Sequence, residues 1–247
     1  MKTLFKINIF TYLFFLLSML SGYFKEISIA YIILIIHELG HFFLMKYYDI
    51  NVDNITLYPY GGMIKSNMLI NTNSLRVLII SLGGILSQVL LYIVMFFLYK
   101  FYVIDFNIFS LFIKYNLYII IFNLLPIYPL DGFKILSSIL ELIFNFKLSI
   151  KISFIINIIF LVLFIIYLYL LKINNYMIVI FLLCSLFNYL KEIKYIINKF
   201  YIERIIYDLK YNGLISVNSI SNMYKNKFNY INGINEDEYL EKSYKIG

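Results

Sequence analysis

Several residue types are scarce in this chain of 247 residues. It has two histidines, three prolines, one cysteine and no tryptophan. The single cysteine, Cys184, excludes a disulfide within the chain and disfavours a metal site built from cysteines.

Charge is also scarce, and hydrophobic residues take its place. Charged residues make up 14% of the chain and hydrophobic residues 62%, with a mean hydropathy of +0.83. Soluble domains average roughly 45–50% apolar and about 25% charged residues. A soluble core of 29.5 kDa could not hide several apolar runs of this length, so the sequence predicts an integral membrane protein.

Six apolar runs approach the ~20 residues needed to cross the hydrocarbon. They cover about 7–24, 27–48, 74–99, 110–125, 150–171 and 175–190. A cleaved signal peptide is an alternative for the first run, but Ser18–Gly22 is a weak cleavage site, so we expect a retained helix. The prediction is an all-α membrane protein, a six-transmembrane-helix bundle in residues 1–190.

The basic residues predict the orientation. Placing the N-terminus in the cytoplasm puts eight basic residues and the basic tail inside, and four lysines outside. The inside set is Lys2, Lys6, Lys46, Lys65, Arg76, Lys134, Lys147 and Lys151, and the outside set is Lys25, Lys100, Lys114 and Lys172. The positive-inside rule then predicts a multi-pass protein with both termini in the cytoplasm. The net charge of +7 indicates contact with anionic headgroups and no nucleic acid.

Two segments differ from the apolar runs. Residues 49–73 contain two β-like stretches around Pro59 and Gly61, which predict a short re-entrant β-hairpin-like loop. Its edge could add a substrate strand, with Tyr58, Tyr60 and Gly61 in contact with it; alternatively it is an ordinary interfacial loop with belt aromatics. Residues 191–247 are expected to form a cytoplasmic amphipathic helix, 191–204, and a short tail without a clear CBS pattern.

Both histidines lie in one motif inside the second apolar run, His37-Glu38-Leu39-Gly40-His41. Residues four apart share a helix face, roughly 6 Å apart along the axis. Two imidazoles at this spacing can bind one Zn²⁺, with Glu38 as the general base. Glu38 could instead be a salt-bridge partner, but its own run has no basic residue nearby.

Catalytic zinc needs a third protein ligand. With no other histidine, a carboxylate is expected, and Asp131 follows a run that Pro126 and Pro129 interrupt. Irregular backbone is tolerated at membrane depth where it lines a cavity. Asp131 could alternatively cap the helix that follows, and Asn123 could satisfy carbonyls freed at the break.

The paired motifs resemble the site-2-protease family of intramembrane zinc metalloproteases. The resemblance implies that His37, His41 and Asp131 bind one zinc ion per chain, that Glu38 is catalytic and that Asn123 lies near the substrate. Gly84 and Gln88 match a Gly-Pro-x-x-Asn pattern of the family only in part, and Lys134 stands near a family arginine. The loop and the span layout most resemble the stage IV sporulation branch, which cleaves a pro-sigma factor.

The expected function is therefore intramembrane proteolysis. The expected partners are a membrane-associated protein substrate, such as a pro-sigma factor, the lipid bilayer and inhibitory membrane proteins. A catalytically inactive protein that binds a client helix is the main alternative. A metal transporter is disfavoured because the other runs hold few ionisable residues.

Overall fold

The computed structural model describes residues 5–58, 61–172, 176–207, 209, 211 and 213–244. It forms two compact units. The first consists of residues 1–68 and 79–123, and the second of residues 69–78 and 124–247. Helix α3, Ser74–Lys100, begins in the second unit and continues in the first.

Three helices of the first unit are long and apolar enough to cross a membrane: α2 (Phe24–Tyr47), α3 and α4 (Phe106–Leu124). They agree closely with the predicted runs at 27–48, 74–99 and 110–125. Ile33, Phe109 and Phe112 form a buried cluster within this unit.

The first helix of the structure is shorter than the apolar run predicted at residues 7–24. Residues Phe5–Ile7 form strand β1, and α1 begins only at Ile9 and ends at Leu20. The side chain of Asn8 caps α1 by accepting a hydrogen bond from the Phe10 amide, 3.0 Å away. At 1.5 Å per residue this helix is about 18 Å long, less than the ~30 Å of hydrocarbon. At the start of the run β1 pairs with a strand far away in the sequence, and at its end the chain turns at Gly22, whose φ is 79°, before α2 begins at Phe24.

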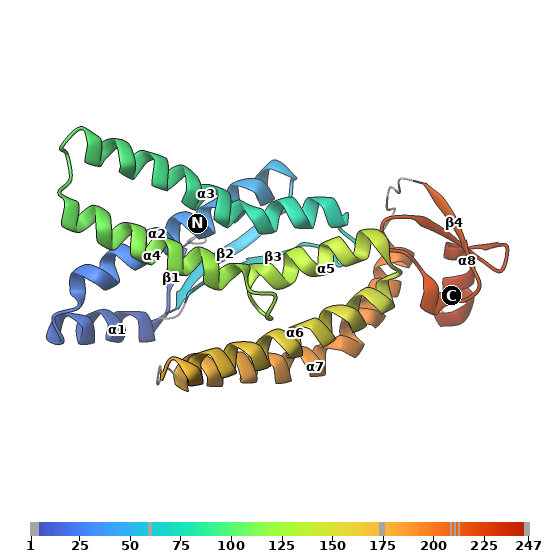
Figure 1. Ribbon diagram of the computed structural model, residues 1–247. Helices are drawn as coiled ribbons and strands as arrows, with labels where there is room; N and C mark the ends of the chain where they lie inside the picture. The colour runs from blue at the N-terminus through green and yellow to red at the C-terminus, as the bar shows by residue number, and fades with distance from the viewer. Residues whose placement is uncertain are drawn as a thin grey trace. The chain divides into compact units, whose positions relative to one another are not determined.

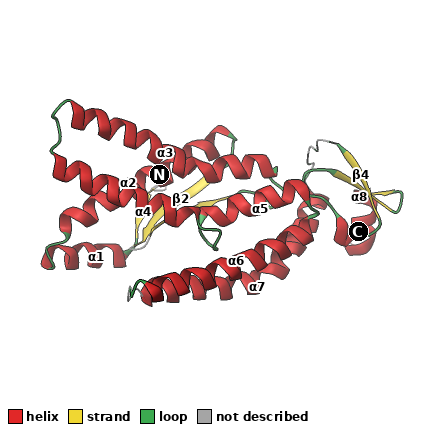
Figure 2. Cartoon of the chain, in the orientation of Figure 1, coloured by secondary structure: helices red, strands yellow, loops and turns green. Residues whose placement is uncertain are grey.

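The predicted hairpin is present in the first unit. Strand β2 (Val52–Tyr58) pairs antiparallel with β3 (Gly61–Ser66), and β1 adds to β2 in parallel, giving the order β1-β2-β3. Helix α1 is joined to this sheet by a hydrogen bond of 2.9 Å, which the Thr11 hydroxyl donates to the Leu57 carbonyl. The strands are coloured yellow in Figure 2.

The second unit contains three further helices: α5 (Asp131–Ile143), α6 (Phe146–Leu170) and α7 (Tyr176–Ile206). Figure 1 shows that α5 and α6 run in opposite directions, joined by a short turn. Asn145 in this turn caps α6, because its side chain accepts from the Leu148 amide at 2.8 Å. Of these helices α6 alone meets the length and composition expected of a span, so four described helices of the chain do so in all.

Helix α7 joins two segments that the sequence interpretation separated, a span over 175–190 and an amphipathic helix over 191–204. The expected domain boundary at residue 190 lies inside this helix. The apolar face of its second half packs on protein, since Phe200 is fully buried and stacks on Phe146 with ring centroids 4.0 Å apart. This packing explains the amphipathic pattern without a membrane surface.

The C-terminal tail is folded. Strand β4 (Leu214–Val217) pairs in parallel with β5 (Phe228–Ile231), which pairs antiparallel with β6 (Ile234–Asn235); the 3₁₀ turn η1 (Ile220–Asn222) and helix α8 (Glu236–Tyr244) complete it. We call residues 214–244 the C-terminal subdomain. With two small sheets the chain is mostly helical, and the all-α expectation was too simple.

A buried ion pair organises this subdomain. Arg204 of α7 donates to both carboxylate oxygens of Glu236, at 2.7 and 2.6 Å, and neither side chain is exposed. Arg204 also donates to the carbonyls of Tyr224 and Lys225. A second pair joins Lys225 to Glu141 of α5 over 2.7 Å. Buried charges are tolerated only when they are paired and hydrogen-bonded in this way.

Candidate active site

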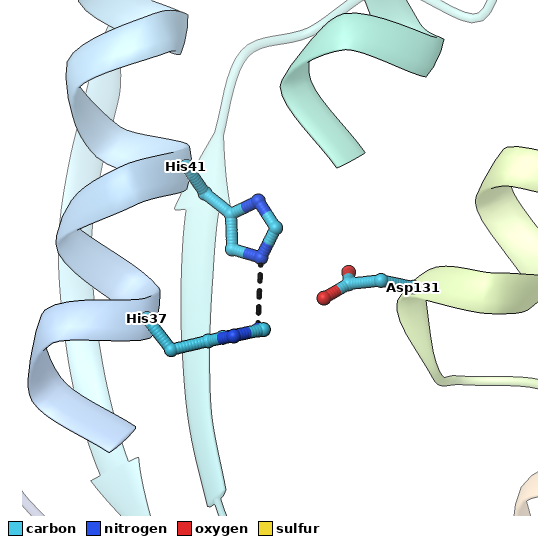
Figure 3. Close-up of side chains that lie close together, drawn as sticks. All are labelled: His37, His41 and Asp131. Atoms are coloured by element: carbon cyan, nitrogen blue, oxygen red, sulfur yellow. Dashed lines mark hydrogen bonds between the residues drawn. The ribbon is translucent and has the colours of Figure 1, made fainter. Parts of the chain in front are cut away.

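The two histidines and the glutamate of the sequence motif lie in the second half of α2, and all three are buried. His37 and His41 are one turn apart and face each other, with their Nε2 atoms 3.1 Å apart. Figure 3 shows this contact as a dashed line. The predicted HExxH helix is therefore present, with both imidazoles on one face.

The other ring nitrogens define the state of this pair. His41 Nδ1 lies 2.7 Å from the backbone carbonyl of Ile80, and His37 Nδ1 lies 2.9 Å from Oε1 of Gln88. Both oxygens only accept hydrogen bonds, so each Nδ1 carries the proton. The Nε2 atoms then point two lone pairs at each other, an arrangement that a cation between them stabilises. This donor set fits zinc, which prefers neutral imidazole with the second nitrogen hydrogen-bonded.

Asp131 is the first residue of α5, and its carboxylate is buried. The N-cap of this helix is Leu130, which makes no side-chain cap, so Asp131 occupies the first turn rather than the cap position. Gly132 packs against the Leu124 and Leu125 carbonyls so closely that a side chain there would clash. Lys134 Nζ donates to Asp131 Oδ1 at 3.1 Å.

The three predicted ligands are donor types that zinc prefers. His37 and His41 of α2 each offer an imidazole nitrogen, and Asp131 of α5 offers a carboxylate oxygen. Two imidazoles and a carboxylate are a ligand set of catalytic zinc sites.

Glycines allow close approach around the motif. The Cα of Gly62 in β3 faces Glu38 so closely that a Cβ would overlap the Glu38 side chain. The Cα of Gly84 in α3 faces the His37 ring in the same way. Gly40 and Gly83 bring the backbones of α2 and α3 together. Small residues on α3 thus allow the two helices to pack closely.

Three of the four residues expected to contact substrate are described in the structure. Tyr58 ends β2, and its carbonyl accepts a hydrogen bond from the Tyr31 hydroxyl at 3.0 Å. Gly61 begins β3 with open space beside its Cα, and Tyr60 lies outside the described residues. Asn123 donates to the Ile119 carbonyl of its own helix at 3.1 Å.

Asn116 was missed by the sequence interpretation. It is 5% exposed in α4 and accepts a hydrogen bond from Gln88 Nε2 over 3.2 Å, so it is linked through Gln88 to His37. The available signal was an amide at the centre of an apolar run, because buried amides in a span need hydrogen-bond partners.

Comparison of the sequence with models of protein families identifies the family. The model of peptidase family M50 matches residues 26–105 and 103–168, which together are more than half of the chain. This chain belongs to peptidase family M50. It is accordingly a zinc metalloprotease of the site-2 type and an integral membrane protein.

Individual M50 relatives agree with the family match. Stage IV sporulation protein FB of Bacillus subtilis is 29% identical over 205 residues, covering 81% of this chain and 71% of that protein. A zinc metalloprotease of Methanocaldococcus jannaschii is 29% identical over 165 residues, covering 65% of this chain and 46% of that protein.

A solved structure supports the M50 fold. The site-2 protease from Methanocaldococcus jannaschii superposes with a TM-score of 0.54 and 25% sequence identity. The match covers 74% of this chain and 87% of that one. The site-2-protease fold expected from the paired motifs is therefore confirmed.

Proposed function

We propose that this M50 peptidase cleaves a peptide bond in or beside a membrane-embedded segment of another protein, and that its substrate is a sporulation pro-sigma factor. The main support is the buried motif on α2, where Glu38 lies between two histidines whose Nε2 atoms converge. The choice of substrate rests on the similarity to stage IV sporulation protein FB.

In this proposal His37, His41 and Asp131 hold one zinc ion. Zinc held there would supply Lewis-acid polarisation of the scissile carbonyl and a bound water whose pKa is lowered toward ~7. Glu38 receives the proton from the attacking water and delivers it to the leaving amine nitrogen. Lys134, which donates to Asp131 Oδ1 at 3.1 Å, holds one oxygen of that carboxylate in place.

Strand β3 is proposed to hold the substrate. Within the described residues β3 pairs with β2 alone, so its second edge can take an additional strand. Neighbouring strands lie about 4.8 Å apart, and Gly62 already places β3 against Glu38. An added strand would therefore lie close to the general base. A helical substrate must unwind to pair in this way, which also exposes its peptide bond.

We assign supporting contacts to four more residues. Tyr58, Tyr60 and Gly61 would contact the substrate. Asn123 would hold the substrate near the reacting carbonyl, because its bond to Ile119 uses only one of the two amide protons.

The experiment that tests this function is co-expression in a heterologous bacterium. A tagged pro-sigma N-terminal region is expressed with the wild-type protein or with Glu38→Gln. A shorter product with the wild type alone is the expected result. Equal cleavage by both proteins would contradict the role of Glu38. If zinc-loaded wild-type protein captures the substrate without cutting it, the inactive client-binding alternative holds.

We also propose six membrane crossings with both termini in the cytoplasm. Residues 176–190 of α7 and the segment around α1 would supply the two crossings beyond α2, α3, α4 and α6. A variant with Cys184→Ser and one new cysteine at Tyr23, Lys100, Lys65 or Lys147 tests this in intact cells. An impermeant maleimide should label the first two positions and spare the last two. Labelling of position 23 only after lysis would remove α1 as a crossing.

A further inference from the structure

Two amide side chains are buried in the apolar helices beside the histidines. Gln88 of α3 is 0% exposed and Asn116 of α4 is 5% exposed. Amides without partners are expensive in such surroundings, so their hydrogen bonds are expected to be complete and oriented.

The direction of these hydrogen bonds is set by one backbone atom. Asn116 Nδ2 faces the Gln88 main-chain carbonyl at 3.5 Å, and a carbonyl can only accept. Asn116 therefore turns its Oδ1 to Gln88 Nε2, at 3.2 Å. That contact leaves Gln88 Oε1 facing His37 Nδ1, at 2.9 Å.

The two histidines obtain the same tautomer by different means. His41 donates to the Ile80 main-chain carbonyl, which is fixed by the helix. His37 donates to a side-chain amide, which could turn and present its NH₂ group instead. A turned amide would require the proton on His37 Nε2 and would remove the lone pair that a metal needs. Asn116 prevents this rotation by accepting from Gln88 Nε2.

We propose that Gln88 is a positioning residue for His37 and that Asn116 acts through it. Together they hold the His37 ring with Nε2 unprotonated and directed at the metal. Gly84, one turn before Gln88 on α3, lets the ring lie close to the helix. This inference rests on the proposed role of His37 as a zinc ligand.

The test is the zinc affinity of the full-length protein in detergent, measured by competition with a chromophoric chelator. The variants are Gln88→Leu, Gln88→Glu, Asn116→Leu and the double variant Gln88→Leu/Asn116→Leu. Loss of a partner that orients a ligating histidine weakens metal binding ~10–100-fold, which is the expectation for Gln88→Leu. Gln88→Glu should retain wild-type affinity or exceed it, since a carboxylate also accepts from Nδ1.

Asn116 provides the sharper distinction from a merely structural role. Asn116→Leu should weaken zinc binding less than Gln88→Leu, and the double variant should match Gln88→Leu, because Asn116 acts only through Gln88. The matched control is Thr11→Val, which removes the buried hydrogen bond to Leu57 in the same unit. This control should lower thermal stability without changing zinc affinity.

Different results separate this inference from the proposed function. Wild-type protein that binds no zinc would overturn the metal site and this inference with it. Wild-type binding combined with unchanged affinity in Gln88→Leu, or additive losses in the double variant, would overturn the inference alone. If Gln88→Leu does not fold, the zinc affinities of Asn116→Leu and Thr11→Val are compared instead. A loss in Asn116→Leu alone supports the inference, and equal affinities overturn it.

Discussion

The Cα of Gly62 faces the side chain of Glu38, with no room for a Cβ between them. This contact joins the hairpin to the proposed general base inside one compact unit. The hairpin therefore lies against the proposed general base, and its second strand limits the space around Glu38.

Gly62→Ala should lower cleavage at least ~10-fold while zinc content stays unchanged, because a displacement of about 1 Å in a catalytic site can decrease the rate ~10²-fold. Asp53→Ala, at an exposed position of β2 with no assigned role, is the control. Rates are compared in the co-expression assay. Equal rates for the two variants would show that the contact with Glu38 has no catalytic importance.

Gly84→Ala should weaken zinc binding, because the added methyl group would overlap the His37 ring and displace it. A loss of about 10-fold is expected, comparable to the loss of an orienting partner. Leu86→Ala, at a 54% exposed position of the same helix, serves as the control. Zinc content after dialysis against a weak chelator provides the measurement, and retention of a full zinc equivalent by Gly84→Ala would argue against the assigned ring position.

Asp131→Ala should abolish stoichiometric zinc binding, since two imidazoles alone leave the ion without its third protein ligand. Asp105→Ala, which alters an exposed acid between α3 and α4, should bind one equivalent like the wild type. Metal analysis of the purified proteins compares them. Full zinc occupancy in Asp131→Ala would require another third ligand.

Arg204→Met should destabilise the C-terminal subdomain by about 3–5 kcal/mol, because it leaves the buried Glu236 carboxylate without its cation. The double variant Arg204→Met/Glu236→Leu should recover part of this loss, since no unpaired charge remains. Hydrogen exchange of residues 214–244 reports the effect. Unchanged protection in the single variant would mean that the pair does not hold the subdomain together.

The sequence was informative where chemistry depends on local spacing. His37 and His41 had to share a helix face once α2 was recognised, and the prolines before Asp131 marked the break that ends before α5. The hairpin also followed from local turn residues near Gly61. Helix periodicity and turn chemistry act over a few residues, so these features could be predicted.

The features that were missed depend on long-range pairing. Strand β1 takes the start of the first predicted span because Phe5–Ile7 pairs with Ile55–Leu57, and nothing in the apolar run itself indicates that partner. The tail folds around Arg204 and Glu236, which are 32 residues apart. The role of Asn116 can be recognised only when its hydrogen bond with Gln88 of α3 is known.

The measurement that tests the account most directly is cleavage by purified protein reconstituted in liposomes with the pro-sigma substrate. Wild-type protein, chelator-stripped protein, stripped protein with zinc restored, and zinc-loaded Glu38→Gln are compared. The account predicts cleavage by the first and third samples only, with one zinc per chain in Glu38→Gln. Cleavage by the stripped protein, or by zinc-loaded Glu38→Gln at the wild-type rate, would contradict it.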